Sequence, residues 1–244
     1  MSAACESGRF VTPDGVSLAW TRRGSSGQRA ILVVPGILMH REAPEHRLLA
    51  ERLARVADVV TLDVRGHGDS RGTFSWGRRE HEDVAAFARS LRGEYGRLGG
   101  LGFSFGGFHV CVAAALARPF DAVASVCAPS SLFVLDHNPL GRGLRRTLPW
   151  ILRRRRRFAW LGAPGLRRPS PARLVGAIAP VPLLVVHGTH DWLVSARHAR
   201  RLHDAAGEPR ALHLVAGGLH AEAMLADDPE ALLAPLEAFF AERL

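Results

Sequence analysis

Two hydrophobic patterns alternate along most of the chain, short continuous apolar runs and longer amphipathic segments. Residues 30–34 (AILVV) form an unbroken and largely β-branched run, which is typical of a strand buried on both faces of a parallel sheet. Within residues 44–57 the apolar side chains recur every three or four positions, which predicts an amphipathic helix. Each run of one kind is followed by a segment of the other kind, so the chain is expected to alternate between strands and helices.

Applied to the whole chain, these two patterns predict a complete set of elements. The chain opens with a hairpin of residues 9–12 and 16–22 around Pro13-Asp14-Gly15, a turn-forming tripeptide. Further strands are predicted at residues 30–34, 58–62, 98–103, 122–127, 182–187 and 211–215. Helices are predicted at residues 44–57, 80–92, 105–117, 196–206 and 229–242. Alternation of this kind indicates an α/β fold with a mostly parallel central sheet and helices on both faces.

A long connection between two predicted strands interrupts this alternation at about residues 129–178. It is too long for an ordinary loop, and long connections in compact domains are usually functional. The 244 residues, 47% hydrophobic and 23% charged, fit one globular domain. We therefore predict a single domain over residues 1–244 with a cap insertion at about 129–178.

The positive charge of the chain is concentrated in this insertion and not in the rest of the fold. The chain has no lysine, so all 32 basic residues are arginines, and the net charge is +9. Residues 130–176 alone carry a net charge of +10, because this segment contains eleven arginines and only one acidic residue, Asp136. The run Arg153–Arg157 is expected to face water, an anionic membrane surface, or a phosphate-bearing substrate such as an acyl-CoA. Nucleic-acid binding is not expected, since no aromatic-rich surface or known module accompanies the charge.

Composition excludes several other classes of protein. No window approaches the roughly 18 to 20 consecutive apolar residues that a membrane span requires. The first residues lack the basic start and apolar stretch of a signal peptide, so a cytoplasmic location is expected. The three cysteines, Cys5, Cys111 and Cys127, are odd in number and have no metal-binding spacing, which argues against a disulfide framework or zinc site.

The pattern G-x-S-x-G occurs at residues 102–106, directly between a predicted strand and a predicted helix. A serine on so sharp a turn projects its hydroxyl above the edge of the sheet, and the flanking glycines avoid collisions with neighbouring backbone. The helix beginning at Phe105 directs its N-terminal amides toward an oxyanion forming at Ser104. Ser104 is therefore the candidate nucleophile.

A serine hydroxyl needs a general base, and the base needs an acid that orients it. His220 lies on a loop after the last predicted strand, where its imidazole can reach Ser104. Asp191 leaves an earlier strand at the same carboxyl edge of the sheet, where catalytic residues of open α/β folds gather. Asp136 is a rival for the acid, and His187 and His190 are expected to order the turn rather than transfer protons.

A second oxyanion donor is expected in the loop after residues 30–34, which reads Pro35-Gly36-Ile37-Leu38. Gly36 permits close backbone approach, so the Ile37 amide is predicted to act together with that of Phe105. A plain Pro-Gly turn without this role is the alternative.

Together these residues resemble the α/β-hydrolase superfamily, and the resemblance covers nearly the whole chain. Residues 63–70, DVRGHGDS, are similar to the D-x-R-G-H-G-x-S turn common in its esterase, lipase and peptidase branches. Residues 187–194 are similar to the motif that carries the superfamily's catalytic acid, and the order Ser, Asp, His is the expected one. In this resemblance Arg65 and His67 belong to the scaffold. One departure is that many relatives carry His-Gly where this chain has Pro35-Gly36.

The identity of the nucleophile narrows the chemistry that the resemblance implies. Dehalogenases and epoxide hydrolases of this fold use an aspartate at the position of Ser104, which leaves acyl transfer to water. Hydrolysis of carboxylic esters with apolar acyl groups is the leading hypothesis, by analogy at the level of the fold. A thioesterase, a small-peptide amidase, a C–C hydrolase and an inactive binding protein remain alternatives. No cofactor or metal is expected, because no dinucleotide fingerprint, P-loop or metal cluster occurs. The acyl pocket is predicted to be lined by Leu38, Leu148, Ile151, Leu152 and Trp160.

Overall fold

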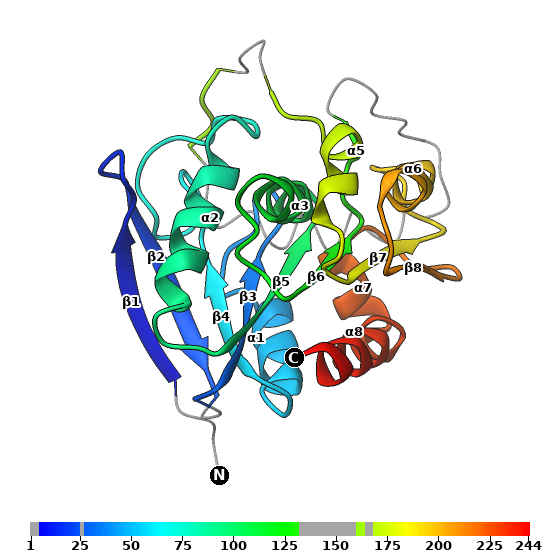
Figure 1. The fold of residues 1–244 in the computed structure, drawn as a ribbon, viewed down its shortest axis with the longest axis horizontal. Coiled ribbons are helices and arrows are strands. Elements are labelled where there is room, and N and C mark those ends of the chain that lie inside the picture. Colours follow the sequence, from blue (N-terminus) through cyan, green and yellow to red (C-terminus); the bar gives the residue numbers. More distant parts are fainter. Residues whose placement is uncertain (1–4, 25–26, 132–159, 164–167) are drawn as a thin grey trace.

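The computed structural model describes residues 5–24, 27–131, 160–163 and 168–244. Within these ranges the strands form one eight-stranded sheet in the order β1-β2-β4-β3-β5-β6-β7-β8 (Figure 1). The first two neighbour pairs, β1 with β2 and β2 with β4, are antiparallel, and every other neighbouring pair is parallel. The bounds are β1 Cys5–Val11, β2 Ser17–Arg23, β3 Arg29–Val34, β4 Asp58–Leu62, β5 Arg97–Phe103, β6 Ala122–Val126, β7 Leu183–Gly188 and β8 Arg210–Val215. This confirms the predicted fold class.

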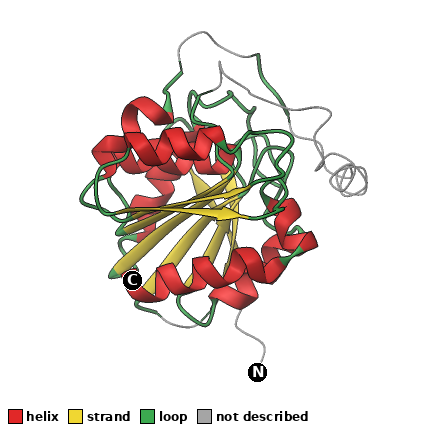
Figure 2. Cartoon of the chain, turned by 90° about the vertical axis from the view of Figure 1, so that its right-hand side faces the viewer, coloured by secondary structure: helices red, strands yellow, loops and turns green. Residues whose placement is uncertain are grey.

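Helices cover both faces of the sheet, as Figure 2 shows. On one face α2 packs on α3, and α3 in turn contacts α5 and the 3₁₀ helix η1, with α6 beside α5. On the other face α1, α7 and α8 contact one another. The bounds are α1 Pro44–Leu53, α2 Glu80–Leu91, α3 Phe105–Ala117, α5 Pro171–Leu174, η1 Val175–Ile178, α6 Arg197–Ala205, α7 Glu222–Asp227 and α8 Pro229–Arg243. No helix in the described ranges combines the length and the apolar character needed to cross a bilayer.

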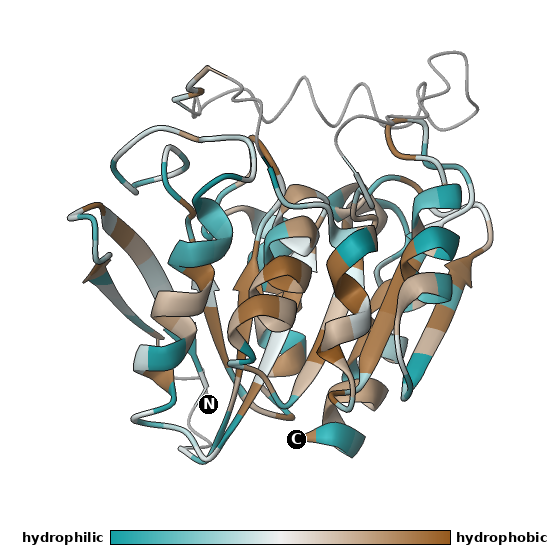
Figure 3. Cartoon of the chain, turned by 45° about the horizontal axis from the view of Figure 1, so that its top comes forward, coloured by the Kyte–Doolittle hydropathy of each residue, from teal (hydrophilic) through white to brown (hydrophobic). Residues whose placement is uncertain are grey.

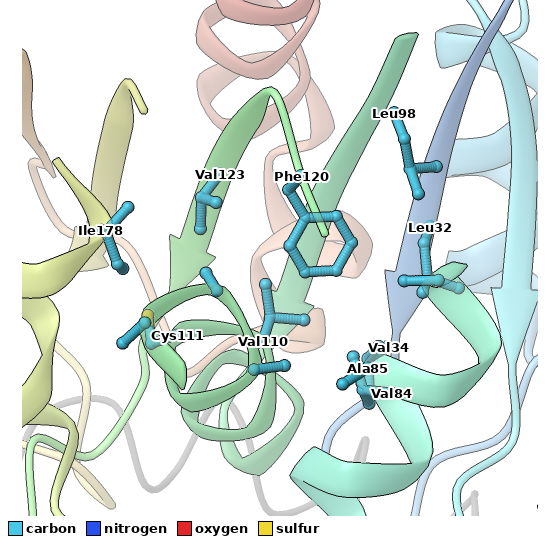
Figure 4. Packing of buried hydrophobic residues seen from close by; sticks show 14 of the residues in the cluster. Leu32, Val34, Val84, Ala85, Leu98, Val110, Cys111, Phe120, Val123 and Ile178 are labelled. Carbon is cyan, nitrogen blue, oxygen red and sulfur yellow. The ribbon is translucent and has the colours of Figure 1, made fainter. Parts of the chain in front are cut away.

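The continuous apolar strands supply both hydrophobic layers, because successive side chains of a strand point to opposite faces. In β3, Leu32 and Val34 join the layer under α2 and α3, whereas Ile31 and Val33 join the layer under α1 and α8. Figure 4 shows part of the first layer, where side chains of α2 and α3 lie against those of the sheet. In Figure 3 the apolar colours follow the central strands, as this burial requires.

The structure differs from the predicted elements in several places: β1 begins at Cys5 rather than at residue 9, and α1 ends at Leu53 rather than at residue 57. The strand predicted to end at Cys127 ends at Val126, because Cys127 has a left-handed φ of 51° that a strand does not accommodate. Residues 222–227 form α7, a helix that the sequence patterns did not predict. The end of the predicted cap insertion forms α5 and η1, and Val175 and Ile178 are buried in the same hydrophobic layer as α3. These last residues therefore belong to the main core.

Candidate active site

Ser104 occupies the single position between the end of β5 and the start of α3. Its φ and ψ are 51° and −118°, a backbone conformation that residues other than glycine rarely adopt. Strained residues of this kind cluster at functional sites. The Ser104 amide donates to the Val126 carbonyl at 2.8 Å, and the Ser104 carbonyl accepts from the Phe108 amide at 3.1 Å. The neighbouring strand and the new helix thus hold the strained turn.

The glycines of the motif are required by the same turn. A Cβ on Gly102 would overlap the backbone of Gly106, and a Cβ on Gly106 would overlap the carbonyl oxygens of Val34 and Pro35. Helix α3 therefore begins in direct contact with the end of β3. This contact places Ser104 beside the loop that follows β3, where the second oxyanion donor is predicted.

The structure brings the three predicted triad residues together. The Nε2 atom of His220 lies 3.0 Å from Ser104 Oγ, and its Nδ1 atom lies 2.6 Å from Asp191 Oδ2. Ser104 follows β5, Asp191 follows β7 and His220 follows β8, so all three lie at the carboxyl edge of the parallel strands. Because an ionised carboxylate only accepts hydrogen bonds, the Nδ1 atom of His220 carries the proton and Nε2 is free to accept one from Ser104.

The Asp191 carboxylate is held by its own turn. Its Oδ1 atom accepts from the amides of Leu193 and Val194, each at 2.9 Å. His187 Nε2 lies 2.8 Å from the Val194 carbonyl and 3.3 Å from Asp191 Oδ2, so His187 closes the turn around the acid. The His190 amide donates to the Gly218 carbonyl at 2.9 Å and ties this turn to the loop of His220. The His187 side chain orders the turn, as the sequence indicated, whereas His190 contributes through its backbone amide. The rival acid Asp136 lies outside the described residues.

Burial and charge act in opposite directions on this pair. Burial by itself raises the pKa of Asp191, but the charge of His220 and the hydrogen bonds from His187 and His220 outweigh it and hold the pKa well below the usual range. Burial by itself lowers the pKa of His220, but the charge and hydrogen bond of Asp191 outweigh it and raise the pKa above the ordinary 6.5. The pair therefore stabilises an imidazolium, the species that forms when His220 takes a proton.

The two backbone amides predicted to bind an oxyanion belong to residues next to Ser104 or to the loop beside it. Phe105 begins α3, so its amide has no acceptor within the helix. Gly36 lies so close to the nucleophile that a Cβ on it would sit 3.2 Å from Ser104 Cβ, which places the adjoining Ile37 amide at the same edge. The positions of both residues agree with the predicted donors, although their role as an oxyanion hole stays a prediction.

The turn at residues 63–70 is held by hydrogen bonds to neighbouring elements, as expected of scaffold. Arg65 makes a two-pronged ion pair with Asp83, at 2.6 and 2.5 Å, and also contacts Asp14 at 3.0 Å. Ser70 Oγ donates to the Asp63 carbonyl at 2.6 Å and accepts from the Ala19 amide at 2.8 Å. These bonds tie the turn to β2 and α2.

The predicted acyl-pocket residues fall partly outside the described ranges, because Leu148, Ile151 and Leu152 lie in 132–159 together with Arg153–Arg157. Leu38 is 54% exposed on the loop after β3. Trp160 is 73% exposed, and its backbone pairs with the amide of Phe74 and the carbonyl of Gly66. Phe74 packs edge-on against Phe105, the residue after the nucleophile, with ring centres 5.6 Å apart. Phe74 therefore links the backbone of Trp160 to the Phe105 ring.

One combination of side chains in the described residues has the spacing of a metal site. Ligand atoms of Cys127, Asp191 and His220 lie within 4.8 Å of one another. Asp191 and His220 are already hydrogen-bonded to each other, so a cation there would have to break the hydrogen bond that orients the base. Burial raises the pKa of the Cys127 thiol well above its ordinary value, which also disfavours the thiolate that a metal requires. The arrangement suits the triad better than a metal.

Comparison with known proteins shows the family of the chain. The model of the alpha/beta hydrolase fold family matches residues 29–179, more than half of the chain. The human protein named "Serine hydrolase BPHL" is 25% identical over 233 residues, covering 86% of this chain and 79% of that one. The Escherichia coli K12 protein YfhR is 35% identical over 54 residues, 22% of this chain and 19% of that one. The chain belongs to the alpha/beta hydrolase fold family.

Solved structures show the same fold. The alpha/beta hydrolase GrgF from Penicillium sp. sh18 superposes with a TM-score of 0.78 at 17% identity, over 98% of this chain and 99% of that one. The Pyrococcus furiosus esterase Pf2001 superposes with a TM-score of 0.77 at 19% identity, over 99% of this chain and 92% of that one. At these identities the similarity establishes the fold and no more.

Proposed function

We propose that this protein is a serine hydrolase that cleaves carboxylic esters with apolar acyl groups through an acyl-enzyme on Ser104. The observation that carries the proposal is the unbroken series of hydrogen bonds from Ser104 Oγ through His220 to Asp191. Each bond has the direction that the chemistry requires, since Asp191 fixes the proton on Nδ1 and leaves Nε2 to act as the base. The esterase and serine hydrolase among the similar proteins are consistent with it.

In the first half of the reaction, Ser104 Oγ attacks the ester carbonyl carbon while its proton moves to His220 Nε2. The carbonyl oxygen becomes an oxyanion that accepts hydrogen bonds from the Phe105 and Ile37 amides. The ester C–O bond then breaks, and the alcohol leaves with the proton from His220 Nε2. The acyl group remains bound to Ser104 as an ester.

In the second half, a water molecule replaces the alcohol and reverses these proton movements. His220 Nε2 takes one proton from the water as its oxygen attacks the acyl carbon. The bond to Ser104 Oγ breaks, Oγ recovers the proton from His220, and a carboxylic acid is released. The charge of Asp191 stabilises the imidazolium in both halves.

The preference for apolar acyl groups rests on the side chains around the nucleophile. The rings of Phe74 and Trp76 pack against Phe105, with ring centres 5.6 and 6.2 Å away, and the exposed Leu38 follows the proposed oxyanion donor. In the sequence, Leu148, Ile151 and Leu152 would add apolar cover. The proposed substrate is therefore a small-molecule ester, and an acyl thioester is the alternative that the arginine-rich insertion favours.

Hydrolysis of p-nitrophenyl esters from acetyl to palmitoyl, beside matched acyl-CoAs, tests the proposal. We expect turnover of the esters that Ser104→Ala reduces by about 10⁴-fold or more, and the preferred chain length measures the acyl pocket. Ser90→Ala is the matched control, because Ser90 is an exposed residue of α2 whose hydroxyl donates to the Phe87 carbonyl. Faster cleavage of the CoA series would replace the ester assignment by a thioesterase.

A fluorophosphonate probe separates an enzyme from an inactive binding protein of the same fold. Labelling requires an activated serine, so we expect covalent modification of the wild type and none of Ser104→Ala. A folded wild-type protein that neither reacts with the probe nor turns over any ester would contradict the proposal and favour the binding protein.

A further inference from the structure

A buried carboxylate lies beside the triad, and the reaction described above does not use it. Glu222 is two residues after His220, begins α7, and is 3% exposed. Ala221, between them, has φ 42° and ψ −119°, a conformation that costs free energy for any residue other than glycine. This strained residue sets the relative directions of the His220 and Glu222 side chains.

The Glu222 carboxylate bonds to the loop that carries the proposed oxyanion donor. Its Oε1 atom accepts from the Gly36 amide at 2.6 Å, in a buried hydrogen bond between residues 186 positions apart. Gly36 directly precedes Ile37, so this bond fixes the peptide next to the proposed donor. A Cβ on Gly36 would lie 3.1 Å from Glu222 Oε1 and 3.2 Å from Ser104 Cβ, which shows how closely carboxylate, loop and nucleophile meet.

A buried histidine completes the arrangement. His46 of α1 is 1% exposed, and its Nε2 atom lies 3.3 Å from the same oxygen, Glu222 Oε1. The His46 ring packs edge-on against Phe103, the residue before the nucleophile, with ring centres 5.4 Å apart. Glu222 is thus joined to the loop after β3, to α1, and through the chain itself to His220.

We propose that Glu222 is a positioning residue that aligns the Gly36–Ile37 peptide with the oxyanion and couples this loop to the loop of His220. The inference rests on the proposed function, because an oxyanion forms only if Ser104 attacks a carbonyl. The glycine gives the loop close access to the nucleophile but also backbone freedom, and the buried hydrogen bond removes that freedom. A donor displaced from its position stabilises the transition state less while leaving ground-state binding nearly unchanged.

Charge at Glu222 has a second, separable effect. Burial by itself raises the pKa of Glu222, but the hydrogen bond and charge of His46 and the Gly36 amide outweigh it, so the pKa is lowered and the carboxylate is ionised. Its negative charge adds to that of Asp191 in raising the pKa of His220. Among the described residues, Asp191 and Glu222 are the charged groups that raise the pKa of His220, and the buried Cys127 thiol lies within 4.8 Å of the reacting atoms of Asp191 and His220. His187 contacts the carboxylate of Asp191, and His46 contacts that of Glu222.

Two conservative variants separate position from charge. Glu222→Gln loses the charge but keeps an oxygen at the length of Oε1, and both hydrogen bonds end on that one atom. Glu222→Asp keeps the charge but is one methylene shorter, so its carboxylate no longer reaches the Gly36 amide. The measurements are kcat, KM and the pH profile of kcat/KM with a p-nitrophenyl ester, and thermal unfolding confirms that each variant is folded.

We expect Glu222→Asp to lower kcat by at least about tenfold with KM within about twofold, and to leave the acid limb of the profile in place. We expect Glu222→Gln to keep kcat within about threefold and to move the acid limb to lower pH. Asp58→Asn is the control for loss of a buried carboxylate, because Asp58 accepts from the Tyr95 hydroxyl at 2.9 Å at the start of β4, the opposite end of the strands. It is expected to change the midpoint of thermal unfolding and not kcat.

A folded Glu222→Asp protein with the kcat of the wild type would overturn this inference alone. A Glu222→Gln protein that loses as much kcat as Glu222→Asp would also overturn it, because an oxygen kept at the position of Oε1 would then not be enough to align the loop. Wild-type protein without turnover that depends on Ser104 would overturn the proposed function and this inference together.

Discussion

The acid of the triad offers the sharpest test, because the structure determines how an asparagine must sit at position 191. Asp191 Oδ1 accepts two amide hydrogen bonds, from Leu193 and Val194, each at 2.9 Å. In Asp191→Asn the amide oxygen must take this position, since a side-chain NH₂ cannot accept from two amides. The NH₂ group then replaces Oδ2 and points at His220.

The consequence is a change of tautomer in the base. An NH₂ group 2.6 Å from His220 Nδ1, the present distance of Oδ2, can only donate, so Nδ1 becomes the acceptor and the proton moves to Nε2. A protonated Nε2 cannot take the proton of Ser104. The charge that raises the pKa of His220 is lost as well. We expect kcat to fall by about 10⁴-fold, equivalent to about 5.5 kcal/mol of transition-state stabilisation.

The assay is steady-state hydrolysis of p-nitrophenyl acetate at pH 8, with Ser104→Ala as the blank and Asp58→Asn as the control. Near-UV circular dichroism shows whether each variant keeps its tertiary structure. A folded Asp191→Asn protein within tenfold of wild-type kcat would refute the reasoning, because either Asp191 is not the acid or its turn does not hold Oδ1.

Three further outcomes follow from the same contacts. Gly106→Ala should lower the free energy of unfolding by about 3 kcal/mol and the unfolding midpoint by about 6 to 12 °C, because its Cβ would overlap the backbone of β3. The control Gly96→Ala meets only ordinary contacts at 3.7 Å and should change the stability by no more than about 1 kcal/mol. Equal stabilities of the two variants would contradict this prediction. The acid limb of the pH profile of kcat/KM should lie above pH 6.5, because His220 acts as a base only when neutral and its raised pKa keeps it protonated to higher pH. An acid limb below pH 6.5 would be inconsistent with the ion pair between Asp191 and His220. Asp228→Ala should lower the free energy of unfolding by about 1 kcal/mol, because the Asp228 carboxylate caps α8 by accepting a hydrogen bond from the Ala231 amide at 3.3 Å. An unchanged midpoint of urea unfolding would show that the cap contributes nothing.

Much of the fold was predictable because its signals are local. The run at residues 30–34 indicated a strand buried on both faces, and β3 is such a strand. The glycines around Ser104 indicated a turn too sharp for larger residues, and the structure gives the reason: a Cβ on Gly102 or Gly106 would overlap neighbouring backbone. The sequence did not predict α7, which is only six residues long and offers too few positions for a helical period.

For the candidate site, the order of motifs and strands was enough to place Ser104, Asp191 and His220 after the carboxyl ends of strands, and so at one edge of the sheet. How the three side chains are held depends on contacts that form only in the folded protein. The hydrogen bond between Gly36 and Glu222 joins residues 186 positions apart, and no spacing in the sequence indicates it. It exists because the strand order puts β3 beside β5, so the loop after β3 lies next to Ser104, where the returning chain after β8 brings His220 and the first turn of α7. Periodicity specifies each element, whereas a contact between elements depends on how the finished sheet is ordered.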